Sequence, residues 1–136
     1  MIVITFQILK TLIMKEFVLI FRTSSTPSTS SAPPPSPEQA QQMMSSWMNW
    51  MGSIAAQNKL ANSGSRLGIA DSKVVKPGNV VTNGPFTEIK EFINGFIVVK
   101  ADSIDEAVEF AKGCPMVIGG GGNVEVRPAV SPENNN

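Results

Sequence analysis

Apolar and polar positions divide the chain into strand-like runs and two amphipathic segments. Residues 15–22 (KEFVLIFR) are a continuous apolar run between charged ends, which predicts a strand that is central in its sheet or covered on both faces. Residues 94–101 (NGFIVVKA) predict a second buried strand. Residues 123–127 (NVEVR) alternate, so we expect Val124 and Val126 to face inward on a last strand with one wet face.

The first amphipathic segment begins with helix-start chemistry. Ser36 supplies a capping hydroxyl, Pro37 suits the first helical position, and Gln39 can complete a capping box. Apolar residues then recur at three- and four-residue steps to about Asn58, which predicts one long helix with a single buried stripe. The stripe comprises Ala40, Met43, Met44, Trp47, Trp50, Met51, Ile54 and Ala55.

The second amphipathic segment predicts a shorter helix. Ser103 caps it, Glu106 can complete a capping box, and Gly113 followed by Pro115 marks its end. The residues expected in its buried stripe are Ile104, Ala107, Val108 and Ala111.

Turn residues separate short extended pieces between residues 60 and 83. Asn62-Ser63-Gly64-Ser65 is a turn sequence, and Pro77-Gly78 is expected to close a hairpin. Asn83-Gly84-Pro85 predicts a sharp corner, because Pro85 fixes its own φ and keeps Gly84 out of the α region. The predicted strands in this part are residues 66–67, 73–76 and 79–82.

This order of elements predicts an α+β fold. Strand, helix, hairpin strands, strand, helix and strand make a plait with both helices on one face of an antiparallel sheet. Two helices cover one face only, although several strands are apolar throughout. We therefore expect a second copy to cover the other face, giving a two-fold homodimer with sheets back to back.

Charge and residue types exclude several classes of function. Eleven basic and eleven acidic side chains leave no net charge, and no run of Lys or Arg could follow a phosphate backbone, so direct nucleic-acid binding is not expected. The chain has no histidine, the commonest general base at neutral pH and a frequent zinc ligand, so neither a metal nor a cofactor is expected. Cys114 is the single cysteine, which agrees with a reducing cytoplasm.

The ends of the chain differ from its middle. Residues 1–14 are apolar but too short to span a bilayer and lack a cleavage signal, so neither a signal peptide nor a membrane partner is expected. They are either an extension upstream of a true start at Met14 or an extra strand or helix. Residues 23–35, almost all Ser, Thr and Pro, predict a long loop, and residues 130–136 predict a disordered tail. The predicted domain is 15–129.

Several motifs occur together in a specific order. They are KEFVLIFR at 15–22, the helix with Trp47 and Trp50, SRLG at 65–68, KVVKPGNVVTNGPFTEIKE at 73–91, GFIVV at 95–99, SIDEAVEFAKGCP at 103–115 and VEVRP at 124–128. Together they resemble the YCII-related family in its DGPF-domain branch, over about residues 14–129. The resemblance implies a bacterial protein with a ferredoxin-like fold assembled as a dimeric α+β barrel, related in fold to muconolactone isomerase-type proteins. Some relatives are fused to sigma-factor domains.

The same resemblance points to a candidate site around the corner. The branch is named for a corner that begins with Asp, but this chain has Asn83, which cannot take a proton at neutral pH. The histidine suspected of catalysis in other branches has no counterpart, so no catalytic residue is assigned. The candidate ligand-binding residues are Asn83, Gly84, Phe86, Arg66, Trp47, Trp50 and Lys90.

Each candidate also has a purely structural interpretation. Asn83 is otherwise a turn residue bonded to the local backbone, and Arg66 a surface ion-pair partner. Phe86 and the two tryptophans are otherwise core residues, and Lys90 a solvated charge. Arg66 as a fork donor suits an organic acid.

Three functions remain open. The one favoured here is a homodimer that binds a small organic ligand without catalysing a reaction. The first alternative is an enzyme of the dimeric barrel type acting on a small organic acid or lactone. The second is an interaction module linked to transcription regulation, which rests on the sigma-factor fusions of relatives.

Overall fold

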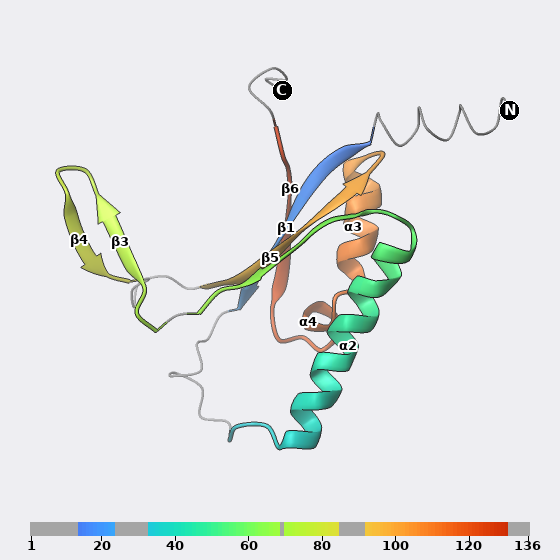
Figure 1. Cartoon of the computed structure of the whole chain (residues 1–136), viewed down its shortest axis with the longest axis horizontal. Coiled ribbons are helices and arrows are strands. Elements are labelled where there is room, and N and C mark those ends of the chain that lie inside the picture. The colour runs from blue at the N-terminus through green and yellow to red at the C-terminus, as the bar shows by residue number, and fades with distance from the viewer. Residues whose placement is uncertain (1–13, 24–32, 69, 85–91, 131–136) are drawn as a thin grey trace, which may run out of the picture.

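An antiparallel sheet forms the centre of the fold. The computed structural model describes residues 14–23, 33–68, 70–84 and 92–130. Within them, one sheet has the strand order β2-β5-β1-β6 (Figure 1). Its strands are β1 (Lys15–Thr23), β2 (Leu60–Arg66), β5 (Phe92–Ala101) and β6 (Asn123–Pro128). The predicted α+β class with an antiparallel sheet is confirmed.

The two central strands bury alternate residues. β1 pairs with β5 from Lys15 opposite Ala101 to Thr23 opposite Phe92, with a register shift after Phe21. Successive side chains of a strand point to opposite faces, and the buried residues share one of them. We call this the helix face, made by Phe17, Leu19, Phe21, Ile97, Val99 and Ala101.

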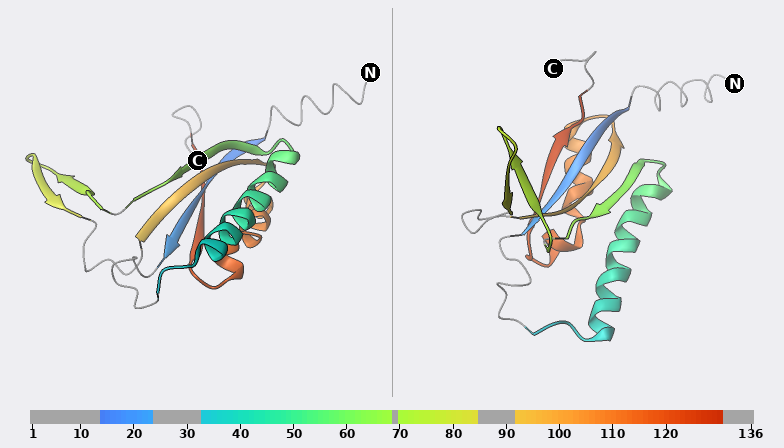
Figure 2. Two further views of the ribbon diagram at one scale, coloured as in Figure 1. Left: turned by 60° about the horizontal axis from the view of Figure 1, so that its bottom comes forward. Right: turned by 60° about the vertical axis from the view of Figure 1, so that its left-hand side comes forward.

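All described helices lie on the helix face (Figures 1 and 2). They are α2 (Pro37–Ala56), α3 (Ile104–Lys112) and the short α4 (Pro115–Ile118), which the sequence did not indicate. The helical side chains buried against the sheet are Trp50, Ile54, Ala107 and Ala111, joined by Cys114. Val124 and Val126 of β6 pack against this core, as predicted.

The start of α2 follows the predicted capping chemistry. Ser36 Oγ accepts a hydrogen bond from the Gln39 backbone N–H at 3.2 Å, and Gln39 Oε1 accepts one from the Ser36 N–H at 3.0 Å. Pro37 occupies the first turn, where its missing N–H costs nothing. The capping box is thus complete, and it starts a helix whose first ten residues are all exposed.

Five residues of the predicted buried stripes are exposed instead: Ala40, Met43, Met44, Ala55 and Ile104. Met43 and Met44 are 57% and 65% exposed, because the first half of α2 has no described segment over it. Burial on α2 begins at Trp47 and is complete only at Trp50 and Ile54. Ile104 is 43% exposed because it occupies the first helical position of α3, at the rim of the core.

The predicted turn at residues 62–65 lies inside strand β2. Gly64 has a φ of +66°, and a Cβ there would meet the Phe96 carbonyl oxygen at 1.6 Å. Asn62 Oδ1 accepts a hydrogen bond from the Gly64 N–H at 2.7 Å, which is local turn chemistry. The pairing of β2 with β5 shifts register on both sides of Asn62, so these residues form a bulge in the strand.

A second, two-stranded sheet projects from the end of the first (Figure 2). We call residues 73–83 the arm: β3 (Lys73–Lys76), a turn, and β4 (Val80–Asn83). Gly78 and Asn79 have φ values of +80° and +60°, which closes the hairpin after Pro77 as predicted. Lys73 pairs with Asn83 at its base, and Val75 pairs with Val81 at its middle.

Removing the cap of α3 should destabilise the domain. Ser103 Oγ accepts a hydrogen bond from the Glu106 N–H at 3.2 Å, so Ser103→Ala leaves that donor without its partner. We expect the free energy of unfolding, measured by urea denaturation, to fall by about 1 kcal/mol. Ser45→Ala, on the exposed middle of α2, is the control and should change stability by less than about 0.5 kcal/mol. Equal losses in the two variants would contradict the capping role.

Candidate functional site

The base of the arm holds the central residue of the predicted site. Asn83 is the last residue of β4, and its Oδ1 accepts a hydrogen bond from Lys73 Nζ across the hairpin. The predicted corner runs on into Pro85, which lies outside the described residues. Gly84 follows, and its N–H donates to the Ser72 carbonyl oxygen at 3.2 Å. The predicted bond from the Asn83 side chain to the local backbone is therefore replaced by a side-chain pair with a lysine.

Arg66 lies at the other end of the loop that leads to the arm. It ends β2 opposite Gly95, is exposed, and forms no ion pair with any described residue. Ser72 Oγ donates a hydrogen bond to the Gly68 carbonyl oxygen at 3.4 Å, which brings the two ends of the loop between β2 and β3 close together. Arg66 is two residues from Gly68 and Lys73 is one from Ser72, so both cations lie near the junction of arm and sheet.

The two tryptophans project from α2 toward the sheet, with Trp50 in the core and Trp47 packed against it. Their rings are 5.6 Å apart, and both meet the Phe21 ring edge-on, at 4.9 Å for Trp47 and 5.9 Å for Trp50. Trp50 Nε1 donates to the Phe110 carbonyl oxygen at 2.9 Å. A Cβ on Gly113 would stand 3.2 Å from the Trp50 ring, so this glycine admits the indole. Trp50 is thus a packed core residue with its polar atom satisfied.

The predicted site residues therefore occupy separate places. Arg66 and Asn83, with Gly84, flank the arm junction, whereas the tryptophans pack from α2 against the helix face. Phe86 and Lys90 lie outside the described residues. Among the described residues, no side-chain hydrogen bond or ion pair joins Asn83 to Arg66 or to either tryptophan.

A shallow depression occurs elsewhere, along the first half of α2. It has a volume of about 660 Å³ and is lined by Glu38, Gln41, Gln42, Ser45, Ser46 and Asn49. All six belong to one polar helix surface, and one helix cannot enclose a ligand. The three- and four-residue spacing of these polar residues could have revealed the surface from the sequence.

The sheet surface opposite the helices is apolar at its centre. Val18 and Ile20 of β1 and Phe96 and Val98 of β5 are half-buried there, and we call this surface the open face. Among the described residues, no helix covers it (Figure 2). The open face therefore leaves apolar side chains in contact with water unless another surface packs on it.

Charged residues border the open face on strand β6. Glu125 stands opposite Ile20, and Arg127 opposite Val18. Arg22 Nη1 approaches Glu125 Oε2 at 3.7 Å, and Arg127 Nη1 approaches Glu125 Oε1 at 3.9 Å. Such a polar rim around an apolar centre is typical of protein interfaces.

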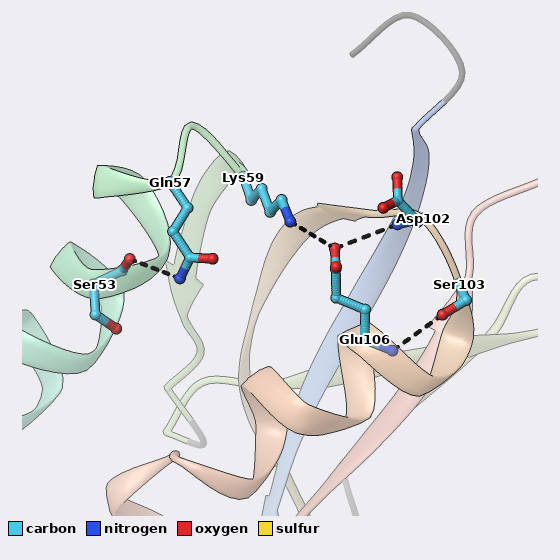
Figure 3. Close-up of polar contacts among 6 residues, drawn as sticks. All are labelled: Ser53, Gln57, Lys59, Asp102, Ser103 and Glu106. Carbon is cyan, nitrogen blue, oxygen red and sulfur yellow. Dashed lines mark hydrogen bonds and ion pairs between the residues drawn. The ribbon is translucent and has the colours of Figure 1, made fainter. Parts of the chain in front are cut away.

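A polar network ties the end of α2 to the start of α3 (Figure 3). Glu106 Oε1 accepts hydrogen bonds from Lys59 Nζ at 2.9 Å and from the Asp102 N–H at 3.3 Å. The capping box expected at Ser103 is thus shifted, because the glutamate reaches the residue before the cap. Lys59 also lies 5.9 Å from the centroid of the Phe110 ring. This network is structural and joins the end of α2 to the start of α3 within the helical layer.

Comparison with known proteins gives the chain its family. Residues 17–130 match the YCII-related domain, which is most of the chain. The chain belongs to the YCII-related family. The uncharacterized protein R00369 of Rhizobium meliloti (strain 1021) is 41% identical over 49 residues, which cover 36% of this chain and 40% of that protein. The match thus spans well under half of that relative's length.

The remaining chemistry of the YCII-related domain is limited in its described part. Burial raises the pKa of the Cys114 thiol, which keeps it protonated and unreactive. The described residues include no group of three or more acidic or cysteine side chains placed to hold a metal ion. None of the described helices has the length and hydropathy to cross a bilayer.

Weakening the Glu106 network should cost more than weakening an exposed ion pair. Glu106→Gln removes the charge that faces Lys59, and both side chains are largely shielded from water. We expect a loss of about 1 kcal/mol in the free energy of unfolding by urea denaturation. The matched control is Glu109→Gln, which breaks the exposed pair with Lys112 at 2.7 Å and should cost clearly less than Glu106→Gln, because water screens that pair. A larger loss at Glu109 would contradict the structural role of the network.

Proposed function

We propose that this YCII-related chain is a homodimer that binds a small organic acid and catalyses no reaction of its own. The observation that carries the proposal is the open face, an apolar surface with a charged rim and no described cover. A second copy is the simplest cover, because a two-fold axis matches a surface with itself. The ligand would bind at the arm junction, near Arg66, Lys73 and Asn83.

We further propose that the fold is a ferredoxin-like plait and that the dimer is an α+β barrel. The strand order β2-β5-β1-β6 supports this, with the arm as an insertion between β2 and β5. Placing α2 and α3 on one face leaves the other available for stacking. The corner at Asn83-Gly84-Pro85-Phe86 supports assignment to the DGPF branch.

The charges at the arm junction favour an anionic ligand. Arg66 offers a planar fork of donors, and Lys73 adds a second positive charge. The Asn83 amide can donate through Nδ2 while its Oδ1 holds Lys73. Asp71, exposed in the same loop, is an acidic residue among the described residues there and would limit the ligand to low net charge. With two cations and one acidic residue described in this region, a ligand with a single negative charge, such as a small monocarboxylate, fits best.

An interaction module without a ligand is the second candidate. The packing of Trp47 and Trp50 into the core favours it, since neither ring is free to wall a pocket. The enzyme alternative has less support, because Asn83 cannot act as a general base at neutral pH. The two candidates differ in one measurable property, the binding of a small carboxylate.

The dimer is tested by placing a charge at the centre of the open face. Wild-type protein should sediment as a dimer at micromolar concentration. Ile20→Lys puts two ammonium groups into the stacked interface, so we expect a monomer with an unchanged circular dichroism spectrum. Ile118→Lys is the matched control, because Ile118 is 74% exposed on α4 on the helix side, and this variant should remain dimeric. A wild-type monomer would remove the assembly from the proposal.

The ligand is tested by calorimetric titration with a panel of small carboxylates from acetate to benzoate. For a carboxylate that binds, Arg66→Gln should weaken affinity at least about tenfold, and Arg66→Lys should weaken it less, since a charge remains. Lys112→Gln, on the exposed face of α3, is the control and should leave affinity unchanged. Unchanged binding by Arg66→Gln would exclude Arg66, and no binding by any carboxylate would favour the interaction module.

A further inference from the structure

Two Asn-Gly pairs occur in the chain, and the fold places them in different environments. Asparagine before glycine is prone to lose its side-chain amide, because glycine has no Cβ to keep its backbone nitrogen away from the asparagine Cγ. The first pair begins at Asn83, the last residue of β4, and the second at Asn94, inside β5. Asn83 is exposed, whereas Asn94 is half-buried and Gly95 after it is buried. The chain therefore contains a reactive sequence and its own internal control.

The side-chain amide of Asn83 is arranged for this loss. Its Oδ1 accepts a hydrogen bond from Lys73 Nζ, which draws electrons from Cγ and would stabilise the negative oxygen formed when a nucleophile adds there. Its Nδ2 donates no hydrogen bond to any described residue, so none of them holds the nitrogen that must leave. Asn94 is the opposite case, because its Nδ2 donates to Thr23 Oγ1 at 2.6 Å and to the Phe92 carbonyl oxygen at 3.4 Å.

The backbone at Asn83 also opens more easily than the backbone at Asn94. The attacking nitrogen belongs to Gly84, whose N–H donates to the Ser72 carbonyl oxygen at 3.2 Å and must first be released. All residues 73–81 of the arm are exposed, and a two-stranded hairpin without packing is marginally stable in water. β5, in contrast, is paired with both β1 and β2. The end of an unpacked hairpin opens at a lower cost in free energy than a central strand.

We propose that Asn83 is a deamidation site assisted by Lys73, and that its conversion to an acid turns off the proposed carboxylate site at the arm junction. The backbone nitrogen of Gly84 gives up its proton and bonds to Asn83 Cγ, which closes a cyclic imide. The Cγ–Nδ2 bond breaks, and Nδ2 leaves with that proton as ammonia. Water then adds to the imide and breaks a ring C–N bond, which leaves aspartate or its β-linked isomer. Water is the only other reactant.

The product changes the charge at the arm junction, and this consequence rests on the proposed function. Both products carry a carboxylate in place of the amide, and position 83 lies opposite Lys73 in the hairpin. The new carboxylate would pair with Lys73 and repel a carboxylate ligand held by Arg66. Asp71 already contributes a negative charge to this region. The positive charge of the junction would therefore be neutralised.

The modification is tested by peptide mapping of protein incubated in mildly alkaline buffer. In the folded protein, mass spectrometry should show Asn83 converting to its acidic forms at least about tenfold faster than Asn94, because only the arm opens locally. In urea both pairs are unfolded, so the two rates should approach each other. Equal rates in the folded protein, or the same ratio in urea, would mean that the fold does not select Asn83, and the proposal would be wrong.

The assistance by Lys73 is tested with two variants that each remove one lysine of the arm. Lys73→Met removes the donor to Asn83 Oδ1, so conversion should slow by at least about threefold, less than the loss of a donor costs in a dry active site. Lys76→Met is the matched control, because Lys76 lies opposite Val80 at the other end of the hairpin, and it should leave the rate unchanged. Equal rates in the two variants would overturn the role of Lys73.

The consequence for binding is measured by calorimetric titration of Asn83→Asp, which is one of the two products made directly. For a carboxylate that binds wild-type protein, Asn83→Asp should weaken affinity at least about tenfold. Asn83→Gln keeps an amide and should weaken it less. Equal affinity of Asn83→Asp and wild type would overturn the switch and leave the proposed function standing. If no carboxylate binds wild type, the proposed function and the switch both fail, and the peptide map alone decides the deamidation.

Discussion

The central strands are apolar on both faces, although the described helices cover only one. β1 directs Phe17, Leu19 and Phe21 toward the helices and Val18 and Ile20 away from them. A strand with one wet face would alternate apolar and polar residues, and β1 does not. This imbalance sets the two main features of the molecule: a well-packed helix face and an opposite surface that water solvates poorly.

A few specific contacts hold α2 against the helix face of the sheet. The Phe21, Trp47 and Trp50 rings pack edge to face, and the Trp50 indole reaches the end of α3 through the Phe110 carbonyl. Gly113 matters here for the space it leaves beside the indole, because its φ of −83° is open to any residue. Aromatic packing, rather than the methionines earlier in α2, therefore fixes the helix on the sheet.

The sequence predicted the elements that local chemistry determines and missed those set by neighbours. Ser36, Ser103 and the turn after Pro77 were found because capping and turn residues act within a few positions. The bulge at Gly64 was interpreted as a turn, because the same residues serve both and only pairing with β5 distinguishes them. Exposure of Met43 was missed, since periodicity shows which residues share a face but not where the sheet ends.

The candidate site was harder to predict because the register of the hairpin decides which side chain lies opposite Asn83. Asn83 suggested a corner, but a turn after Pro77 places position 73 opposite position 83, so a lysine faces the asparagine. An acid at position 83 would form an ion pair with Lys73, which lowers a carboxyl pKa and weakens it as a base. An amide there holds the lysine without neutralising it. The lysine therefore keeps its positive charge at the arm junction, which supports the proposal of a carboxylate ligand over that of a proton-transfer site.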